Sequence, residues 1–353
     1  PLSPAAAWPE DPALNVALCG AANDQTDPVG VTDGAGGAIF AWTDRRSGSY
    51  GDIYVQRISA NGQVLWTVDG VALCTASYVQ RYPAIASDSA GGAIVAWEDE
   101  RSTGDIYVQR ISAAGAIQWT ANGVALCTAA AMQNAPVIVS DGAGGAIVAW
   151  QDSRIGVGSE DIYAQRISAA GAVQWTADGV PLCAAGEAQR HPVIVADGAG
   201  GAIVAWEDAR SASTDIYAQR ISAAGAVQWD VNGVPLCNAG ESQLEPVMVA
   251  DGAGGAIAVW TDGRTGYTDI YAQRISATGT AQWTANGVAV CLETGAQERP
   301  ALAPDGAGGA IAAWQDWRGS YYDIYAQRVS DGGTARWAFN GVALCTASGG
   351  QGV

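Results

Sequence analysis

Short apolar stretches, separated by glycine-containing turns, recur along the chain six times in a fixed order. In the third copy the stretch 136–140 is followed by Asp-Gly-Ala-Gly-Gly and then by Ala-Ile-Val-Ala-Trp, which is apolar at every position. An uninterrupted apolar run is typical of a strand covered on both faces, whereas a half-exposed strand alternates. Self-similarity at a period of about 54 residues indicates one supersecondary unit copied in tandem. The copies begin at Pro28, Pro83, Pro136, Pro192, Pro246 and Pro300.

The remainder of each copy predicts further strands. Trp-x-Asp-x-Arg leads through a loop of variable length into Asp-Ile-Tyr-Ala-Gln-Arg-Ile-Ser, and turns then separate a Gln-Trp strand from a Val-Ala-Leu-Cys segment. Short strands between turn signals, without helical periodicity, predict an all-β protein. A unit this small must stack on its neighbours, and a four-stranded unit in tandem is typical of a propeller blade. We therefore predict a six-bladed β-propeller of four-stranded antiparallel blades, its ring closed by terminal strands.

The chain ends do not divide evenly into blades. Residues 1–24 hold no full repeat, although 15–19 match the end of one, so we predict a closing or donor strand at 1–24 and the propeller at 25–351. Seven Val-Ala-Leu-Cys segments accompany six sets of the other strands. Segments 15–19 and 341–345 therefore compete for the edge of the sixth blade. Closure within one molecule is the favoured interpretation. Strand donation to another copy, giving an open chain of subunits, is the alternative.

Charge limits the partners. The chain of 353 residues has 35 acidic residues and 17 basic ones, all arginine, for a net charge of −18. Binding to nucleic acid needs clustered cations, so we expect no nucleic-acid partner. No apolar run is long enough to span a membrane, so we expect no insertion. The chain opens at Pro1 without a leader, which suits an exported chain after signal removal. We expect a secreted, cell-surface protein that binds a glycan, a protein or another copy of itself.

The cysteines all occupy one position of the repeat. Successive copies are too far apart for the ~5.5 Å Cα separation of a disulfide, so we expect small buried thiols. The exception is Cys19 with Cys345, because the chain ends could meet in a disulfide. Wide spacing also argues against zinc. The seven cysteines are Cys19, Cys74, Cys127, Cys183, Cys237, Cys291 and Cys345.

The segment 59–66, Ser-Ala-Asn-Gly-Gln-Val-Leu-Trp, resembles the Asp-box of sialidase-type propellers, Ser-x-Asp-x-Gly-x-x-Trp. It keeps the Ser and Trp spacing, has Gly one place early, and carries Asn61 nearest to the place of Asp. The other five copies keep Ser, Gly and Trp but have neither Asn nor Asp there. The whole repeat, Gly-Gly-Ala-Ile-Val-Ala-Trp-x-Asp-x-Arg and Asp-Ile-Tyr-Ala-Gln-Arg-Ile, also resembles repeats of large secreted bacterial surface proteins. This resemblance implies export and a propeller-like fold, without a defined activity.

Trp-x-Asp-x-Arg places an acid and a base two residues apart, on one face of a strand, where they can form a charge-assisted bond. The Asp that opens the next strand can join them. A sialidase binds its substrate carboxylate with three unlike arginines, whereas these arginines are identical in every copy, so we interpret them as structural. The pairs are Asp44/Arg46, Asp99/Arg101, Asp152/Arg154, Asp208/Arg210, Asp262/Arg264 and Asp316/Arg318.

The remaining candidates for chemistry are few. The Asp of each Asp-x-Ala-Gly-Gly turn supplies one carboxylate, whereas calcium needs six to eight oxygens, so we expect a turn cap and no metal, with calcium the weaker alternative. His191 is the single histidine and lies in a linker, which disfavours a Ser-His-Asp triad. The acidic residues follow no catalytic motif, and a sialidase-type Tyr–Glu pair cannot be placed. We expect no enzyme and no cofactor. A sialidase-like glycoside hydrolase is the second alternative to the binding role.

The copies differ most in the loop between their second and third strands and in the linkers before each Pro. Both emerge on the same face of a blade, so that face carries the unlike chemistry. Exposed aromatic residues among polar groups suit stacking on sugars or contact with a protein. The bland alternative is that loops tolerate change. The candidate ligand-binding residues are Tyr50, Tyr78, Tyr82, Tyr267, Trp317, Tyr321 and Tyr322.

Overall fold

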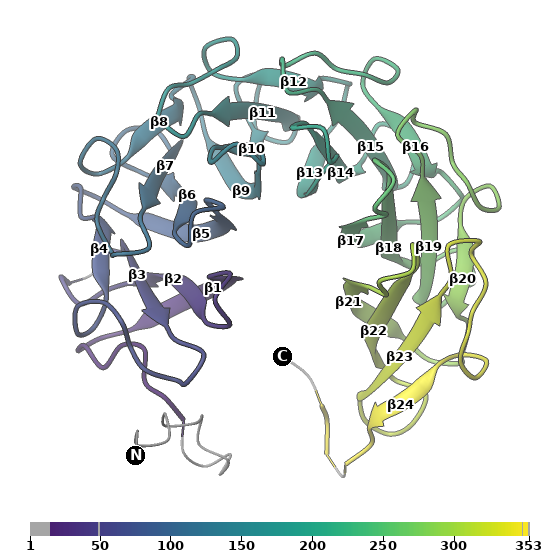
Figure 1. Ribbon diagram of the computed structural model, residues 1–353. Helices are drawn as coiled ribbons and strands as arrows, with labels where there is room; N and C mark the ends of the chain where they lie inside the picture. The colour runs from purple at the N-terminus through teal and green to yellow at the C-terminus, as the bar shows by residue number, and fades with distance from the viewer. Residues whose placement is uncertain (1–14, 49, 348, 352–353) are drawn as a thin grey trace. The chain divides into compact units, whose positions relative to one another are not determined.

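The computed structural model describes residues 15–48, 50–347 and 349–351. These residues form 24 strands and no helix, arranged as six four-stranded sheets (Figure 1). Within every sheet the strands follow chain order and pair antiparallel, as predicted. We call the sheets blades 1 to 6. Part of the predicted terminal segment 1–24 lies outside the described residues.

The strand bounds repeat closely from blade to blade. Blade 1 contains β1 (Gln25–Thr32), β2 (Ala38–Asp44), β3 (Asp52–Ile58) and β4 (Val71–Cys74). Blade 2 contains β5 (Gln80–Ser87), β6 (Ala93–Asp99), β7 (Asp105–Ile111) and β8 (Val124–Cys127). Blade 3 contains β9 (Gln133–Ser140), β10 (Ala146–Asp152), β11 (Asp161–Ile167) and β12 (Val180–Cys183). Blade 4 contains β13 (Gln189–Ala196), β14 (Ala202–Asp208), β15 (Asp215–Ile221) and β16 (Val234–Cys237). Blade 5 contains β17 (Gln243–Ala250), β18 (Ala256–Asp262), β19 (Asp269–Ile275) and β20 (Val288–Cys291). Blade 6 contains β21 (Gln297–Pro304), β22 (Ala310–Asp316), β23 (Asp323–Val329) and β24 (Val342–Cys345).

The predicted Gln-Trp strand is wrong. In blade 1 that segment makes only an isolated bridge, between Ile58 and Val64, and the fourth strand is the Val-Ala-Leu-Cys segment. The reason is the buried Gln56 on β3. Its side chain accepts hydrogen bonds from the backbone N–H of Arg57 and Trp66 and donates one to the carbonyl of Thr67. The amide of Gln56 therefore replaces the backbone pairing that a further strand would supply.

A β-bulge interrupts the pairing of the first two strands in every blade. In blade 1 the register shifts between Thr26 and Val29, whereas β2 and β3 pair without irregularity. The residue before the repeat Pro lies in each bulge and has a positive φ of 50–55°, a region that side chains other than Gly seldom adopt. Bulges of this kind re-aim a side chain. The six residues are Asp27, Tyr82, Ala135, His191, Glu245 and Arg299.

The core lies between successive sheets. Each second strand contributes a Trp that is fully buried in blades 2 to 5, and the adjacent strands supply Ile, Val and Ala. Between blades 1 and 2, for example, Ile39, Ile53 and Leu73 pack with Val95 and Trp97. Burial on both faces explains why the second strand is apolar at successive positions.

Polar contacts repeat at the same junctions. Arg57 Nη1 and Trp66 Nε1 of blade 1 donate to the carbonyl of Ala113 in blade 2, at 2.8 and 3.2 Å. The same arrangement joins three further pairs of blades: Arg110 and Trp119 to Ala169, Arg220 and Trp229 to Ala277, and Arg274 and Trp283 to Asp331.

The chain forms two compact units. The first comprises residues 1–156 and 163–180, and the second comprises 157–162 and 181–353. Blades 1 and 2 belong to the first unit, blades 4 to 6 belong to the second, and blade 3 has residues in both. Closure of a ring by the terminal strands stays a prediction.

Candidate functional site

Each Trp-x-Asp-x-Arg motif forms a closed polar cluster inside the fold. In blade 2 the fully buried Asp99 accepts hydrogen bonds from Trp97 Nε1 at 2.9 Å, from Arg101 Nε at 2.8 Å and from Arg101 Nη2 at 2.6 Å. The guanidinium carbon of Arg101 lies 3.8 Å from the ring centroid of Tyr107, a cation–π contact. All six predicted pairs form salt bridges of 2.5–2.6 Å. With its Asp, Tyr and backbone contacts, this guanidinium is held as part of the framework and not presented to a ligand.

The cysteines complete these clusters from the neighbouring blade. Cys74 Sγ of blade 1 lies 3.2 Å from Arg101 Nη2 of blade 2. Burial raises the pKa of Cys74 to about 12. Cys19 and Cys345 are both free thiols and lie in different units, so their predicted disulfide stays a prediction.

In blades 1, 2, 4 and 5 the Asp that opens the third strand bonds a loop hydroxyl and not the arginine, so the expectation is wrong for these blades. Asp105 Oδ2 instead accepts a hydrogen bond of 2.6 Å from the hydroxyl of Ser102 in the preceding loop. Burial raises the pKa of Asp105, with Asp99 adding to the rise. The same contact forms in blades 1, 4 and 5, from Ser47 to Asp52, Ser211 to Asp215 and Thr265 to Asp269.

The Asp of each glycine-rich turn caps its turn, and an arginine that the sequence did not single out holds it. Asp88 Oδ1 accepts from the backbone N–H of Ala90 and Gly92, both at 2.8 Å, and Oδ2 pairs with Arg110 at 2.9 Å. These contacts engage both oxygens. Within the described ranges no group of three or more His, Cys, Asp or Glu could hold a metal ion. The equivalent pairs are Asp33/Arg57, Asp141/Arg166, Asp197/Arg220, Asp251/Arg274 and Asp305/Arg328.

In the first unit, the variable loops bring two predicted aromatic residues together. Tyr50 and Tyr78 pack edge to face with ring centroids 6.2 Å apart, and both are more than half exposed. Tyr82 follows Tyr78 by four residues and is also exposed. The guanidinium carbon of Arg81 lies 5.3 Å from the ring centroid of Tyr82. Arg81 also pairs with Glu98 and is thereby held in place.

In the second unit, the loop between β22 and β23 gathers a tighter group, which we call the Trp317 cluster: Trp317, Tyr321, Tyr322 and Glu298. The rings of Trp317 and Tyr322 pack edge to face, with centroids 4.8 Å apart. Tyr322 Oη donates to Glu298 Oε2 at 3.0 Å. Burial and this hydrogen bond raise the pKa of Tyr322. Trp317 and Tyr321 remain 43% and 57% exposed. Tyr267 is exposed in its own loop, on the preceding blade.

The bulges build a second feature that the sequence did not reveal, a series of linked glutamates. Glu207 Oε1 accepts from the backbone N–H of Glu245 in the next blade at 2.8 Å, and Oε2 contacts His191 Nδ1 at 2.9 Å. Glu245 Oε2 accepts from the N–H of Arg299 at 3.0 Å in turn. The hydrogen bond to Glu207 raises the pKa of His191. The sequence held one signal for these contacts. The residue before each repeat Pro and the middle residue of Trp-x-Asp both vary from copy to copy.

No protein-family model matches the sequence, and no curated protein matches it either. Among solved structures, an ulvan lyase described as a new family of polysaccharide lyase is 11% identical over 86% of this chain and 78% of its own, with a TM-score of 0.55. A Dyadobacter fermentans protein of unknown function is 12% identical over 88% and 95%, with a TM-score of 0.50. A Hadza microbial sialidase is 13% identical, with a TM-score of 0.49, and the match covers 82% of this chain and 63% of the sialidase.

The first two similarities, together with the six repeated sheets, identify the chain as an all-β, six-bladed propeller. At 11–12% identity they bear on the fold alone. The described residues also contain no helix long and apolar enough to cross a membrane.

Proposed function

We propose that this protein is a non-catalytic propeller that binds a glycan through the Trp317 cluster. The observation that carries the proposal is the edge-to-face packing of Trp317 on Tyr322, with Trp317 still 43% exposed and a carboxylate, Glu298, fixed beside it. Such an arrangement offers an apolar ring for the face of a sugar and oxygen acceptors for its hydroxyl groups. The rings are held by each other, so little conformational entropy remains to be lost on binding.

Charge selects among glycans. The net charge of −18 disfavours anionic polymers, because like charges repel at long range. Among its structural neighbours, the ulvan lyase is described as bound to the saccharide GlcA(1-4)Rha3S, which supports a polysaccharide as the ligand class. We accordingly propose a neutral polysaccharide, met outside the cell by an exported protein.

Affinity electrophoresis tests the proposal with a panel of neutral polysaccharides (arabinan, galactan and xylan) and with ulvan as the anionic control. We expect one or more neutral polymers to retard the protein. Trp317→Ala should weaken retardation at least tenfold, which corresponds to about 1.4 kcal/mol. Phe339→Ala is the matched control, because Phe339 is an 84% exposed aromatic residue in the turn between β23 and β24, away from the cluster. Equal retardation of both variants, or none of the wild type by any polymer, would contradict the proposal.

A protein ligand on the same face was the other partner class expected from the sequence. It would leave the polysaccharide panel blank. If the panel does show glycan binding, Tyr50→Ala tests the aromatic pair Tyr50 and Tyr78 of the first unit, and this variant should leave binding at the Trp317 cluster unchanged.

One observation favours a second candidate, a glycoside hydrolase. The 3.0 Å hydrogen bond between Tyr322 and Glu298 is a Tyr–Glu pair of the kind that sialidases use as nucleophile and base. Against this, Arg210, Arg264 and Arg318 of the same unit are each committed to an aspartate. Release of methylumbelliferone from its N-acetylneuraminic acid glycoside, lost in Tyr322→Phe, would establish hydrolysis. No release above the Tyr322→Phe background would exclude sialidase activity.

A further inference from the structure

Five turns of the chain contain the dipeptide Asn-Gly. In this dipeptide the backbone nitrogen of Gly can attack the side chain of Asn, because Gly has no side chain that hinders the approach. One of the five, Asn61-Gly62, lies in the turn directly after β3 of blade 1. The other four lie in the turn directly before the fourth strand of their blades, where each Asn has a positive φ of 59–64°. We call these four the junction asparagines: Asn122, Asn232, Asn286 and Asn340.

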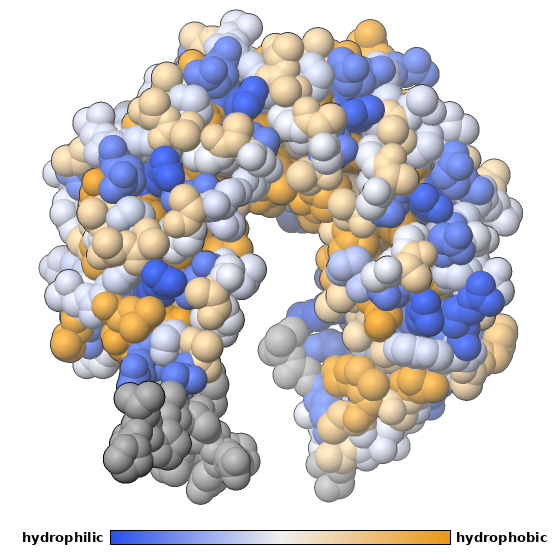
Figure 2. All heavy atoms as spheres, viewed as in Figure 1, coloured by the Kyte–Doolittle hydropathy of each residue, from blue (hydrophilic) through white to orange (hydrophobic). Residues whose placement is uncertain are grey.

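Asn61 lies in a solvated turn. The residue is exposed, and its side chain has no hydrogen bond with the part of the chain that the structure describes. Its backbone N–H donates to Ser59 Oγ at 3.3 Å, and the N–H of Gly62 donates to the Ser59 carbonyl at 2.9 Å. Hydrophilic residues are scattered over the visible face of the first unit (Figure 2). The side chain of Asn61 can therefore turn toward its own backbone at little cost.

A junction asparagine is instead anchored on three sides. In blade 2, Asn122 Oδ1 accepts a hydrogen bond of 3.1 Å from the N–H of Thr75 in blade 1. The backbone carbonyl of Asn122 accepts one of 2.9 Å from Arg101 Nη2. The following Gly123 is buried, and a Cβ there would lie 2.6 Å from the ring of Trp97. The amide group is thus held by the neighbouring blade and the backbone by its own blade.

The same three contacts recur at the other junction asparagines. Each Oδ1 accepts a backbone N–H of the preceding blade at 3.0–3.1 Å. Each backbone carbonyl accepts an arginine Nη2 at 2.8–2.9 Å. A Cβ on the following glycine would lie 2.7 Å from a buried Trp ring in all three blades: Gly233, Gly287 and Gly341.

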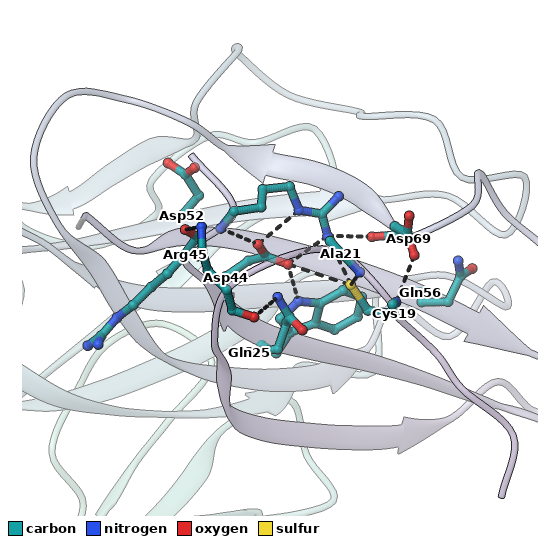
Figure 3. Close-up of polar contacts among 12 residues, drawn as sticks. Cys19, Ala21, Gln25, Asp44, Arg45, Asp52, Gln56 and Asp69 are labelled. Carbon is teal, nitrogen blue, oxygen red and sulfur yellow. Dashed lines mark hydrogen bonds and ion pairs between the residues drawn. The ribbon is translucent and has the colours of Figure 1, made fainter. Parts of the chain in front are cut away.

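Two blades have Asp in place of the junction asparagine, and the contact is unchanged. The N–H of Gly20 donates to Asp69 Oδ1 at 2.8 Å (Figure 3), and the N–H of Thr128 donates to Asp178 Oδ1 at 2.9 Å. A carboxylate therefore fits this position as well as an amide does. Loss of the amide nitrogen would not exclude the residue from the junction. What the fold controls is whether the reaction can begin.

We propose that Asn61 is a site of spontaneous deamidation in the folded protein, and that the blade junctions protect the four junction asparagines. The backbone nitrogen of Gly62 attacks Cγ of Asn61 and forms a C–N bond, which closes a five-membered succinimide ring. The side-chain nitrogen leaves as ammonia and takes the proton of the Gly62 N–H with it. Water then opens the ring at either carbonyl, giving Asp or isoaspartate. The change adds one negative charge to the first unit and leaves the junctions intact.

The difference in rate arises from local opening. Ring closure requires Cγ of the Asn to reach the nitrogen of the next residue. At a junction the side chain must first release the neighbouring blade, and the turn must rotate against a buried Trp ring. The reaction then proceeds only from an opened state, and its rate falls with the population of that state. The exposed turn at Asn61 opens at much lower cost, because its side chain has no such anchor.

Incubation of the full chain at pH 8 and 37 °C, followed by mass spectrometry of its peptides, tests the proposal. We expect Asn61 to convert at least about tenfold faster than each junction asparagine, because loops open locally far more often than packed elements. In urea all five should convert at similar rates, since each is followed by Gly. Equal rates for Asn61 and the junction asparagines in the native protein overturn the proposal. So does a rate for Asn61 that is no higher in the native protein than that of Asn122.

Thr75→Pro tests the anchor itself, because it removes the N–H that Asn122 accepts. The ratio of the conversion rates of Asn122 and Asn232 within one sample cancels any general loss of stability. We expect this ratio to rise severalfold in the variant, since the contacts of Asn232 lie in other blades. An unchanged ratio would show that the bond between blades does not protect the side chain, and would overturn the proposed protection.

Discussion

Cys74 and Arg101 lie in different blades, yet the Sγ atom of one is 3.2 Å from Nη2 of the other. The thiol packs against the salt bridge between Arg101 and Asp99, and Asp99 is fully buried. Burial raises the pKa of Cys74, Cys127, Cys183 and Cys291 to about 12 and that of Cys237 to about 11. The repeated cysteine is therefore a packing residue that stays a thiol.

The rate of thiol labelling should depend on how deeply each cysteine is buried and on how far burial raises its pKa. A pKa of about 12 in place of 9.0 lowers the thiolate fraction at pH 8 about a thousandfold. With iodoacetamide and mass spectrometry of the peptides, we expect the partly exposed Cys345 to be modified first and Cys74 and Cys127 last. Urea should make all seven react alike. Early labelling of Cys127 in the native protein would contradict this packing role.

The two aspartates that flank one loop should respond differently to neutralisation. Asp99→Asn leaves Arg101 without its buried partner and should lower the free energy of unfolding by about 3 kcal/mol. Asp105→Asn should change it by less than about 1 kcal/mol, because burial already disfavours the charged form of Asp105 and raises its pKa. Urea denaturation of both variants at pH 7 makes the comparison. Equal losses would mean that Asp105 pairs with a cation in solution.

Gly123, a turn glycine of blade 2, should be hard to replace. It has a φ of 90°, and a Cβ there would lie 2.6 Å from the ring of Trp97, which is fully buried. Gly142→Ala is the control, because Gly142 has a φ of 72° and nothing within 4 Å of its Cβ position. We expect Gly142→Ala to cost about 1 kcal/mol from backbone strain alone. Gly123→Ala should cost about 1–3 kcal/mol more, from overpacking. Equal melting temperatures would contradict the close contact with Trp97.

The pair of His191 and Glu207 should contribute to stability only at low pH. The hydrogen bond to Glu207 raises the pKa of His191 above its ordinary 6.5, Glu245 adds to the rise and Arg190 opposes it. A raised pKa means that the folded protein holds the proton more tightly. The stabilisation is thus complete below pH 6.5 and is lost as the pH rises through the folded-state pKa. His191→Gln should lower the melting temperature at pH 5.5 and leave it unchanged at pH 9. A loss of the same size at both values would show that the imidazole acts by packing.

The strand order could be predicted from the sequence because each strand carries a local pattern between turn signals. The partners of Arg57 could not be predicted in this way. Arg57 binds the carboxylate of Asp33, 24 residues before it, and the carbonyl of Ala113, 56 residues after it in the next blade. Contacts of this kind depend on how blades stack, which no local pattern encodes. The Gln-Trp strand failed for a related reason, since the side chain of Gln56 takes the place of a strand.

The aromatic part of the candidate site could be predicted as a set of residues, but not as pairs. Variation among the copies singled out Trp317 and Tyr322, and the structure brings their rings to 4.8 Å. Glu298 was one of several acidic residues without a motif, and its pairing with Tyr322 could not be predicted because 24 residues separate the two. The bulge before each Pro, which positions Glu245 and Arg299 with positive φ, also left no signature beyond the variability of that position.

Blade junctions that use the same Trp, Arg and Cys contacts each time have a consequence for inheritance. Removing or adding one block of about 54 residues would bring together two surfaces that already fit, whichever blade is lost or gained. A variant of this chain with one blade fewer or one blade more could therefore keep the contacts that join its blades.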